Sequence, residues 1–168
     1  MSIRLIPLLL VVPVFAYAAN SPDAKFYKHA AEGGLAEVEL GQLAQKKSQS
    51  QAVQDFGALM VKDHSAANEK LQAIAAGKGL SLPTSPSIAQ AAAKGKLEVL
   101  SGHTFDKSYI KGMVKDHKED IAEFNKEATS GQDPDAKAFA TATLPTLKEH
   151  LQKIQSIAKS AGVSVDEN

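Results

Sequence analysis

The stretch VQDFGALMVKDHSAANEKLQAI, residues 53–74, predicts a long amphipathic helix. Its apolar side chains recur at steps of three or four residues, which places them on one face of an α-helix. This face consists of Val53, Phe56, Met60, His64, Ala67, Leu71 and Ile74. His64 stands in the middle of the face, so the sequence predicts a side chain that can bind a metal ion or a proton inside an apolar surface.

Other stretches of the chain repeat this arrangement. The pentapeptide MVKDH at residues 60–64 returns at residues 113–117, and the looser LKEH occupies residues 147–150. The histidines of these copies again stand in the middle of apolar stripes, as does Glu37 in the first predicted helix. The sequence leaves two interpretations open: a shared pattern of apolar helices, or the reuse of one duplicated hairpin or site element.

The composition and the boundary signals predict an all-α fold. Ala, Lys, Gln, Glu and Leu dominate, whereas β-branched and aromatic residues are sparse, which favours helix over strand. Capping residues, prolines and glycines predict five helices. Four are long, over residues 22–47, 51 to about 77, 104–129 and 134–162, and one is short, over residues 88–100. Pro145 lies inside the last helix and is expected to kink it.

The connection between the second and third long helices decides the topology. It contains Pro83, Pro86 and the short helix, and is therefore long enough for a crossover that lets its two neighbours run parallel. We predict a ferritin-like four-helix bundle with a crossover connection that carries a short extra helix. An up-down-up-down bundle is the alternative.

The first 18 residues have the pattern of a cleaved signal peptide. Arg4 supplies a positive start, residues 5–15 are apolar, and Ala-Tyr-Ala at residues 16–18 is a cleavage signal. The predicted organisation is a signal peptide over residues 1–18, a helical bundle over residues 19–162 and a polar, frayed tail over residues 163–168. This pattern predicts a periplasmic or secreted protein.

The composition also excludes several classes of function. The chain has 19 basic and 19 acidic residues, and this balance argues against a nucleic-acid partner. The absence of cysteine excludes disulfides, thiolate metal sites and cysteine nucleophiles. No phosphate-binding loop or nucleophile elbow occurs, and no apolar run after the signal peptide is long enough to span a membrane. We therefore expect no catalytic and no organic cofactor-binding residues.

The polar residues at the centres of the four long helical stripes form a candidate metal site. They are Glu37, His64, His117 and His150. Further residues, each directly before a histidine or one turn before it, are expected to support the site. These are Asp63, Asp116, Glu149, Met60 and Met113. Imidazole with carboxylate suits iron or zinc, and the addition of a thioether suits copper.

The same residues allow a second interpretation. Buried histidines can hydrogen-bond across helices and fix the register of a bundle without any metal. A di-iron enzyme is disfavoured, because such bundles use Glu-x-x-His on two helices. Here the residues three before the histidines are Val61, Val114 and Leu147.

Four segments, one in each long helix, carry a family resemblance. They are Glu37–Gly41 with Leu43 and Ala44; Met60–Ser65 with Asn68 and Leu71; Phe105, Asp106, Tyr109, Ile110, Met113, Val114, Asp116 and His117; and Leu144, Pro145, His150 and Leu151. In this order they resemble the secreted bacterial domain-of-unknown-function family 4142, whose members are often labelled as outer membrane proteins. The resemblance implies a ferritin-like bundle and no particular reaction, since the family has no established activity.

Three functions from different classes follow as hypotheses. The first is a non-catalytic periplasmic bundle with a role in the envelope or in stress that acts through its surface. The second is a metal-binding or metal-buffering protein that uses the His/Glu cluster. The third, a redox or di-metal enzyme, has the least support. The sequence indicates no particular protein partner.

Overall fold

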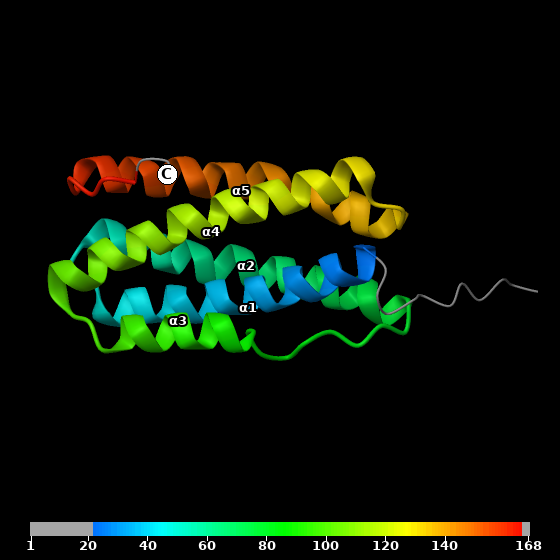
Figure 1. The fold of residues 1–168 in the computed structure, drawn as a ribbon, viewed down its shortest axis with the longest axis horizontal. Coiled ribbons are helices and arrows are strands. Elements are labelled where there is room, and N and C mark those ends of the chain that lie inside the picture. The colour runs from blue at the N-terminus through cyan, green and yellow to red at the C-terminus, as the bar shows by residue number, and fades with distance from the viewer. Residues whose placement is uncertain (1–21, 166–168) are drawn as a thin grey trace, which may run out of the picture.

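The computed structural model describes residues 22–165, which form five helices (Figure 1). They are α1 (Pro22–Lys47), α2 (Gln51–Gly77), α3 (Ile88–Glu98), α4 (Gly102–Ser130) and α5 (Pro134–Ser160). The predicted all-α fold, with four long helices and a short one, is confirmed. The predicted signal peptide lies outside the described residues. Within residues 22–165, no helix combines the length and the apolar character that a membrane span needs.

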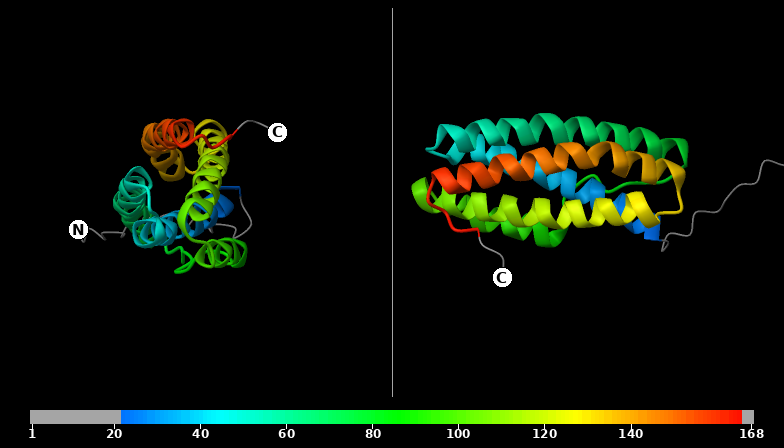
Figure 2. Two further views of the ribbon diagram at one scale, coloured as in Figure 1. Left: turned by 90° about the vertical axis from the view of Figure 1, so that its left-hand side faces the viewer. Right: turned by 90° about the horizontal axis from the view of Figure 1, so that it is seen from above.

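The helices form two antiparallel hairpins joined by a crossover. α1 packs mainly on α2, and α4 packs mainly on α5. The chain between α2 and α4 runs back along the whole bundle, so these two helices point in the same direction (Figures 1 and 2). α3 lies within this connection and contacts α1 and α4. The topology is the predicted ferritin-like one, and the up-down-up-down alternative does not apply.

Local signals set the helix ends, with two differences from the sequence prediction. Asp133 accepts a hydrogen bond from the amide of Asp135 and caps α5, as its position predicts. Ser50 occupies the N-cap position of α2, but its side chain makes no capping bond. The predicted start of α4 at Thr104 is wrong: α4 begins at Gly102. α5 continues through Pro145 to its end at Ser160.

A pair of facing glycines brings α1 and α2 close together. A Cβ atom on Gly41 would lie 2.5 Å from the carbonyl oxygen of Gly57, and a Cβ on Gly57 would lie 2.6 Å from that of Gly41. At Gly34 the neighbouring group is the side chain of Asn68, and Gly33 has only a distant neighbour.

The core consists of two apolar clusters with a polar layer between them. One cluster contains Phe56, Met60 and Met113 and extends to Val163, so the tail predicted to fray is anchored at its start. The other surrounds Phe124 and Leu147. The histidines of α2, α4 and α5 lie between residues of the two clusters along each helix. The apolar faces of the bundle thus hold a group of polar side chains at mid-length.

Candidate metal centre

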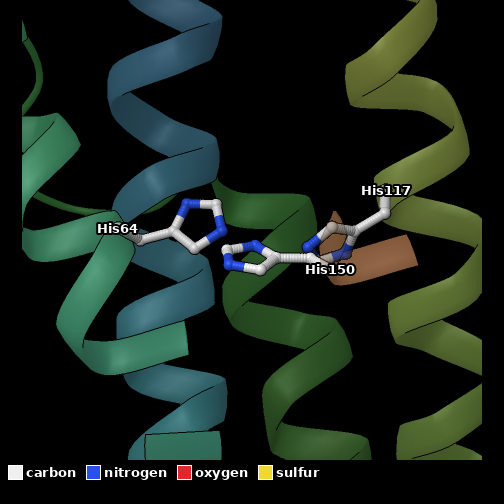
Figure 3. A group of neighbouring side chains, drawn as sticks. All are labelled: His64, His117 and His150. Atoms are coloured by element: carbon white, nitrogen blue, oxygen red, sulfur yellow. The ribbon is translucent and has the colours of Figure 1, made fainter. Parts of the chain in front are cut away.

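His64, His117 and His150 meet in the middle of the bundle (Figure 3). They come from α2, α4 and α5, and at most 7% of any of these residues is exposed. Their ring centroids are 5.5 to 5.9 Å apart. One ring nitrogen from each histidine lies within 4.8 Å of those of the other two. The crossover brings the hairpins into register, so that three histidines from three helices share one layer.

One nitrogen on each ring has no hydrogen-bond partner among the described residues. These atoms are Nε2 of His64, Nε2 of His117 and Nδ1 of His150, and all three are buried. No hydrogen bond joins any two of the three rings within residues 22–165. Buried polar atoms are normally paired, so three unpaired nitrogens in one place are unusual.

The other nitrogens of two rings are held by neighbouring acceptors. Nδ1 of His117 donates to the carbonyl oxygen of Met113 at 2.9 Å. Nε2 of His150 donates to Oδ2 of Asp63 on α2 at 3.0 Å. Because a carbonyl or carboxylate oxygen only accepts, these bonds place the proton on the bonded nitrogen and leave a lone pair on the unpaired one. Metal-binding histidines are oriented in the same way by acceptors behind the ring.

Burial keeps the three rings neutral. Burial, together with the charges of the other two histidines, lowers the pKa of His64 to about 3. Burial, together with the charge of His150, lowers the pKa of His117 to about 4. Burial also lowers the pKa of His150, although the hydrogen bond and the charge of Asp63 oppose this shift. Neutral imidazole is the form that binds metals, so the three ligands are ready at neutral pH.

Glu37 lies beside this group rather than within it. Its Oε1 is 3.8 Å from Nδ1 of His117, the nitrogen already bonded to Met113. The group of three nitrogens within 4.8 Å of one another does not include Glu37. Burial raises the pKa of Glu37 well above its usual value, and Asp120 and Asp116 raise it further. The structure therefore brings together three of the four residues predicted to bind metal and puts the fourth behind one of them.

The supporting residues occupy different positions around the group. Asp63 holds His150, whereas Glu149 is exposed. Asp116 is partly buried and lies near Glu37. Met60 and Met113 are fully buried in the apolar cluster that adjoins the histidines.

Sequence reasoning missed Phe56 as part of the site. Its ring centroid lies 6.1 Å from that of His117 and 6.3 Å from that of His150. Phe56 lies on the same helical stripe as His64, two turns earlier, and this spacing could have indicated that its ring adjoins the histidines. The ring closes the histidine layer toward the apolar cluster.

Two hollows reach the histidines from outside. A groove of about 260 Å³ between α2 and α5 is lined by Asp63, His64, Glu149 and His150, among others. A smaller cavity of about 20 Å³ borders His64 from the side of Gly33. A volume of that size accommodates about one water molecule. Both hollows end at histidine side chains, and the three unpaired nitrogens themselves are buried.

The fold and the site together define a class: a four-helix bundle with one crossover and a cluster of buried histidines in its core. The sequence matches the profile of the domain of unknown function DUF4142 over residues 13–157. The protein therefore belongs to the DUF4142 family, as the four quoted segments predict. Comparison of the sequence with curated proteins gives no match.

Solved structures share the fold. The DUF305 protein from Streptomyces coelicolor, described as a "putative secreted protein", superposes with a TM-score of 0.76 at 14% identity, covering 90% of this chain and 99% of its own. A DUF305 fragment from Deinococcus radiodurans superposes with a TM-score of 0.73 at 13% identity, covering 84% of this chain and 97% of its own. At such low identity, the similarity shows a common all-helical architecture.

Proposed function

We propose that the protein binds a transition-metal ion through His64, His117 and His150. The observation that carries this proposal is the meeting of three buried imidazoles: one nitrogen of each lies within 4.8 Å of those of the other two, and each ring has a nitrogen without a hydrogen-bond partner among the described residues. On His117 and His150 the unpaired nitrogen carries a lone pair, because the proton is held on the other nitrogen, so these two atoms cannot hydrogen-bond to each other. A metal cation among the three rings would satisfy both of these atoms and the unpaired nitrogen of His64.

The donor set favours zinc or copper over iron. Three neutral imidazoles form known zinc and copper sites, whereas non-haem iron sites usually include a carboxylate ligand. Glu37 stands behind His117 rather than beside the three nitrogens, so it fits the role of a nearby negative charge. Asp63, which already holds His150, supplies a second one. These two acids compensate part of the charge of a divalent ion in the core.

We propose further that the protein works outside the cytoplasm as a metal-binding or metal-buffering protein. The signal-peptide pattern of residues 1–18 supports export. The description of the Streptomyces neighbour as secreted agrees with this location. Metal binding and buffering need no catalytic residues, which fits the lack of catalytic motifs in the sequence.

Thermal unfolding with and without metal tests the proposal. A metal at 100 times its dissociation constant is expected to stabilise the fold by about 2.7 kcal/mol. His117→Ala and His64→Ala should remove this metal-dependent stabilisation. His29→Ala is the matched control, because His29 is exposed and pairs with Glu123 on the surface.

The register hypothesis gives a different result in the same experiment. If the histidines only hold the helices in register, metal leaves the melting temperature unchanged. Their removal then costs about 1–3 kcal/mol whether metal is present or not. An equal metal response in His117→Ala and His29→Ala would place the binding on the surface and refute the core site.

A further inference from the structure

The end of the bundle at which α1 begins holds a separate group of buried polar side chains. There the first turn of α1 meets the last turn of α4 and the first turn of α5 (Figure 1). The group contains three carboxyls that are at most 6% exposed: Asp23 from α1, Glu127 from α4 and Asp133, the N-cap of α5. Glu127 lies about 15 Å further along α4 than His117, so this group is distinct from the histidine layer.

Two of the three carboxyls are held by donors from other elements. Asp133 accepts a hydrogen bond from the hydroxyl of Tyr27 at 3.2 Å and pairs with Lys78, which follows α2, at 2.9 Å. Asp23 accepts a hydrogen bond from the amide of Gln132 at 2.8 Å. This last bond joins the first turn of α1 to the turn between α4 and α5.

Glu127 has an oxygen without any such donor. Its Oε1 is buried and has no hydrogen-bond partner among the described residues. The backbone of Gly131 lies directly against this oxygen, so that a Cβ atom at that position would clash with it. An ionised carboxylate here would lack the partners that a buried charge needs, whereas a protonated one is neutral and can donate to a neighbouring carboxylate.

The surroundings of Glu127 favour its protonated form. Burial, the hydrogen bond with Asp23 and the charges of Asp23 and Asp133 raise the pKa of Glu127 to about 7, although the charge of Lys137 opposes this shift. The other titratable side chains of the group interact with Asp133 rather than with Glu127 alone; they are Tyr27, Lys78 and Asp135.

The helix dipoles assign the proton to the same partner. Asp23 lies in the first turn of α1, where the positive end of the dipole stabilises a negative charge. Glu127 lies in the last turn of α4, where the negative end of the dipole disfavours one. In the closed pair, Glu127 therefore carries the proton and Asp23 the charge.

We propose that Asp23 and Glu127 form a pH-sensitive clasp, which fastens the start of α1 to the end of α4 while the two carboxyls share a proton. When Glu127 loses that proton, two buried carboxylates face each other and repel. Asp23 then moves away, and its bond to the amide of Gln132 weakens. The first turns of α1 are released from the turn between α4 and α5, while the histidine layer at mid-length stays in place.

The direction of the pH dependence follows from the raised pKa of Glu127. The closed clasp binds the proton more tightly than the open one, in which the carboxyl has its ordinary pKa of about 4.5. The stabilisation by the clasp is therefore complete below about pH 4.5 and is lost as the pH rises through about 7. Alkaline surroundings should open this end of the bundle, and acidic ones should close it.

NMR titration of the mature protein tests whether Glu127 holds the proton. The carboxyl carbon of Glu127 should titrate with a midpoint near pH 7, and the amide of Gln132 should shift with the same midpoint. Asp23→Asn should lower the midpoint, because it removes the neighbouring negative charge. A midpoint for Glu127 at or below about pH 5 would refute the clasp.

Hydrogen exchange at residues 26–30 of α1 tests whether the proton controls the opening. From pH 5.5 to pH 8.5, the opening constant, corrected for the intrinsic exchange rate, should rise about ten-fold or more. Glu127→Gln keeps a hydrogen-bond donor but cannot ionise, so the rise should disappear. Glu119→Gln is the matched control, because Glu119 is exposed on the same helix, and it should keep the rise. An equal rise in Glu127→Gln and in the unmodified protein would overturn the proposal.

Discussion

The pKa values of the buried histidines predict how metal affinity depends on pH. Protons compete with a metal only when the pH approaches the pKa of the ligand in the folded protein. Because burial lowers the pKa of His64 to about 3 and that of His117 to about 4, both rings stay neutral well below pH 6. Their contribution to metal affinity should therefore be fully present at pH 5.5 and be lost only as the pH falls toward 4.

Histidines with ordinary and with lowered pKa values differ strongly in how much metal affinity they lose between pH 7.5 and pH 5.5. A histidine with the ordinary pKa of about 6.5 is about ten-elevenths protonated at pH 5.5, so each such ligand costs about ten-fold in affinity relative to pH 7.5. Two such ligands cost about 100-fold, or about 2.7 kcal/mol. With the lowered pKa values of His64 and His117, the same change in pH costs almost nothing.

The assay is a competition titration of Zn²⁺ at pH 7.5 and pH 5.5 with a chelator of known affinity. It should be made in the Glu37→Gln variant as well as in the unmodified protein. Burial raises the pKa of Glu37, so metal binding nearby can release a proton from it and add a pH dependence of its own. We expect the dissociation constant of Glu37→Gln to rise by less than about ten-fold, because the pKa of His150, the one remaining ligand, is also lowered from 6.5. A loss of about 100-fold would mean that the ligands are histidines with ordinary pKa values, and would refute the buried site.

Three other predictions follow, two from the structure and one from the sequence. Asp63→Asn should weaken metal binding about 10–100-fold with little effect on the fold, because Asp63 orients His150; unchanged affinity in the titration would show that this hydrogen bond is incidental. Gly41→Ala should destabilise the protein by about 1–3 kcal/mol in urea unfolding, because the new Cβ meets a carbonyl oxygen of α2. Gly112→Ala, where a Cβ meets nothing within 4 Å, should instead be neutral or stabilising by up to about 1 kcal/mol, and equal effects at the two positions would contradict the close approach. Intact-mass analysis of the exported protein should show an N-terminus at Ala19, and retention of the first 18 residues in a membrane fraction would contradict the signal peptide.

The helical pattern predicts which residues enter the core, because burial follows a simple period. His64, His117 and His150 each interrupt an apolar stripe with a step of three or four, and each is buried in the structure. The long, proline-containing connection likewise predicts the crossover, since two parallel neighbours cannot be joined by a short turn. These features depend on local sequence and chain length, and both can be read directly.

Relations between helices were harder to predict. Glu37 lies on the buried face of α1, as its helical stripe predicts. The packing of α1 on α4, however, places its carboxyl group next to Nδ1 of His117, the nitrogen that is bonded to Met113. The facing pair Gly41 and Gly57 looks no different in sequence from Gly33 and Gly34, because close approach depends on where two helices cross. The pairing of Asp63 with His150 likewise depends on how α2 and α5 are rotated. Such features arise from packing, which a single sequence does not specify.

X-ray absorption spectroscopy of the zinc-loaded protein tests the central claim most directly, because it counts the imidazole ligands of the bound metal. We predict three imidazoles per ion in the unmodified protein and in His29→Ala, and fewer than three in His117→Ala. A spectrum dominated by carboxylate oxygens, or one with the same imidazole count in His117→Ala, would contradict a metal centre of His64, His117 and His150.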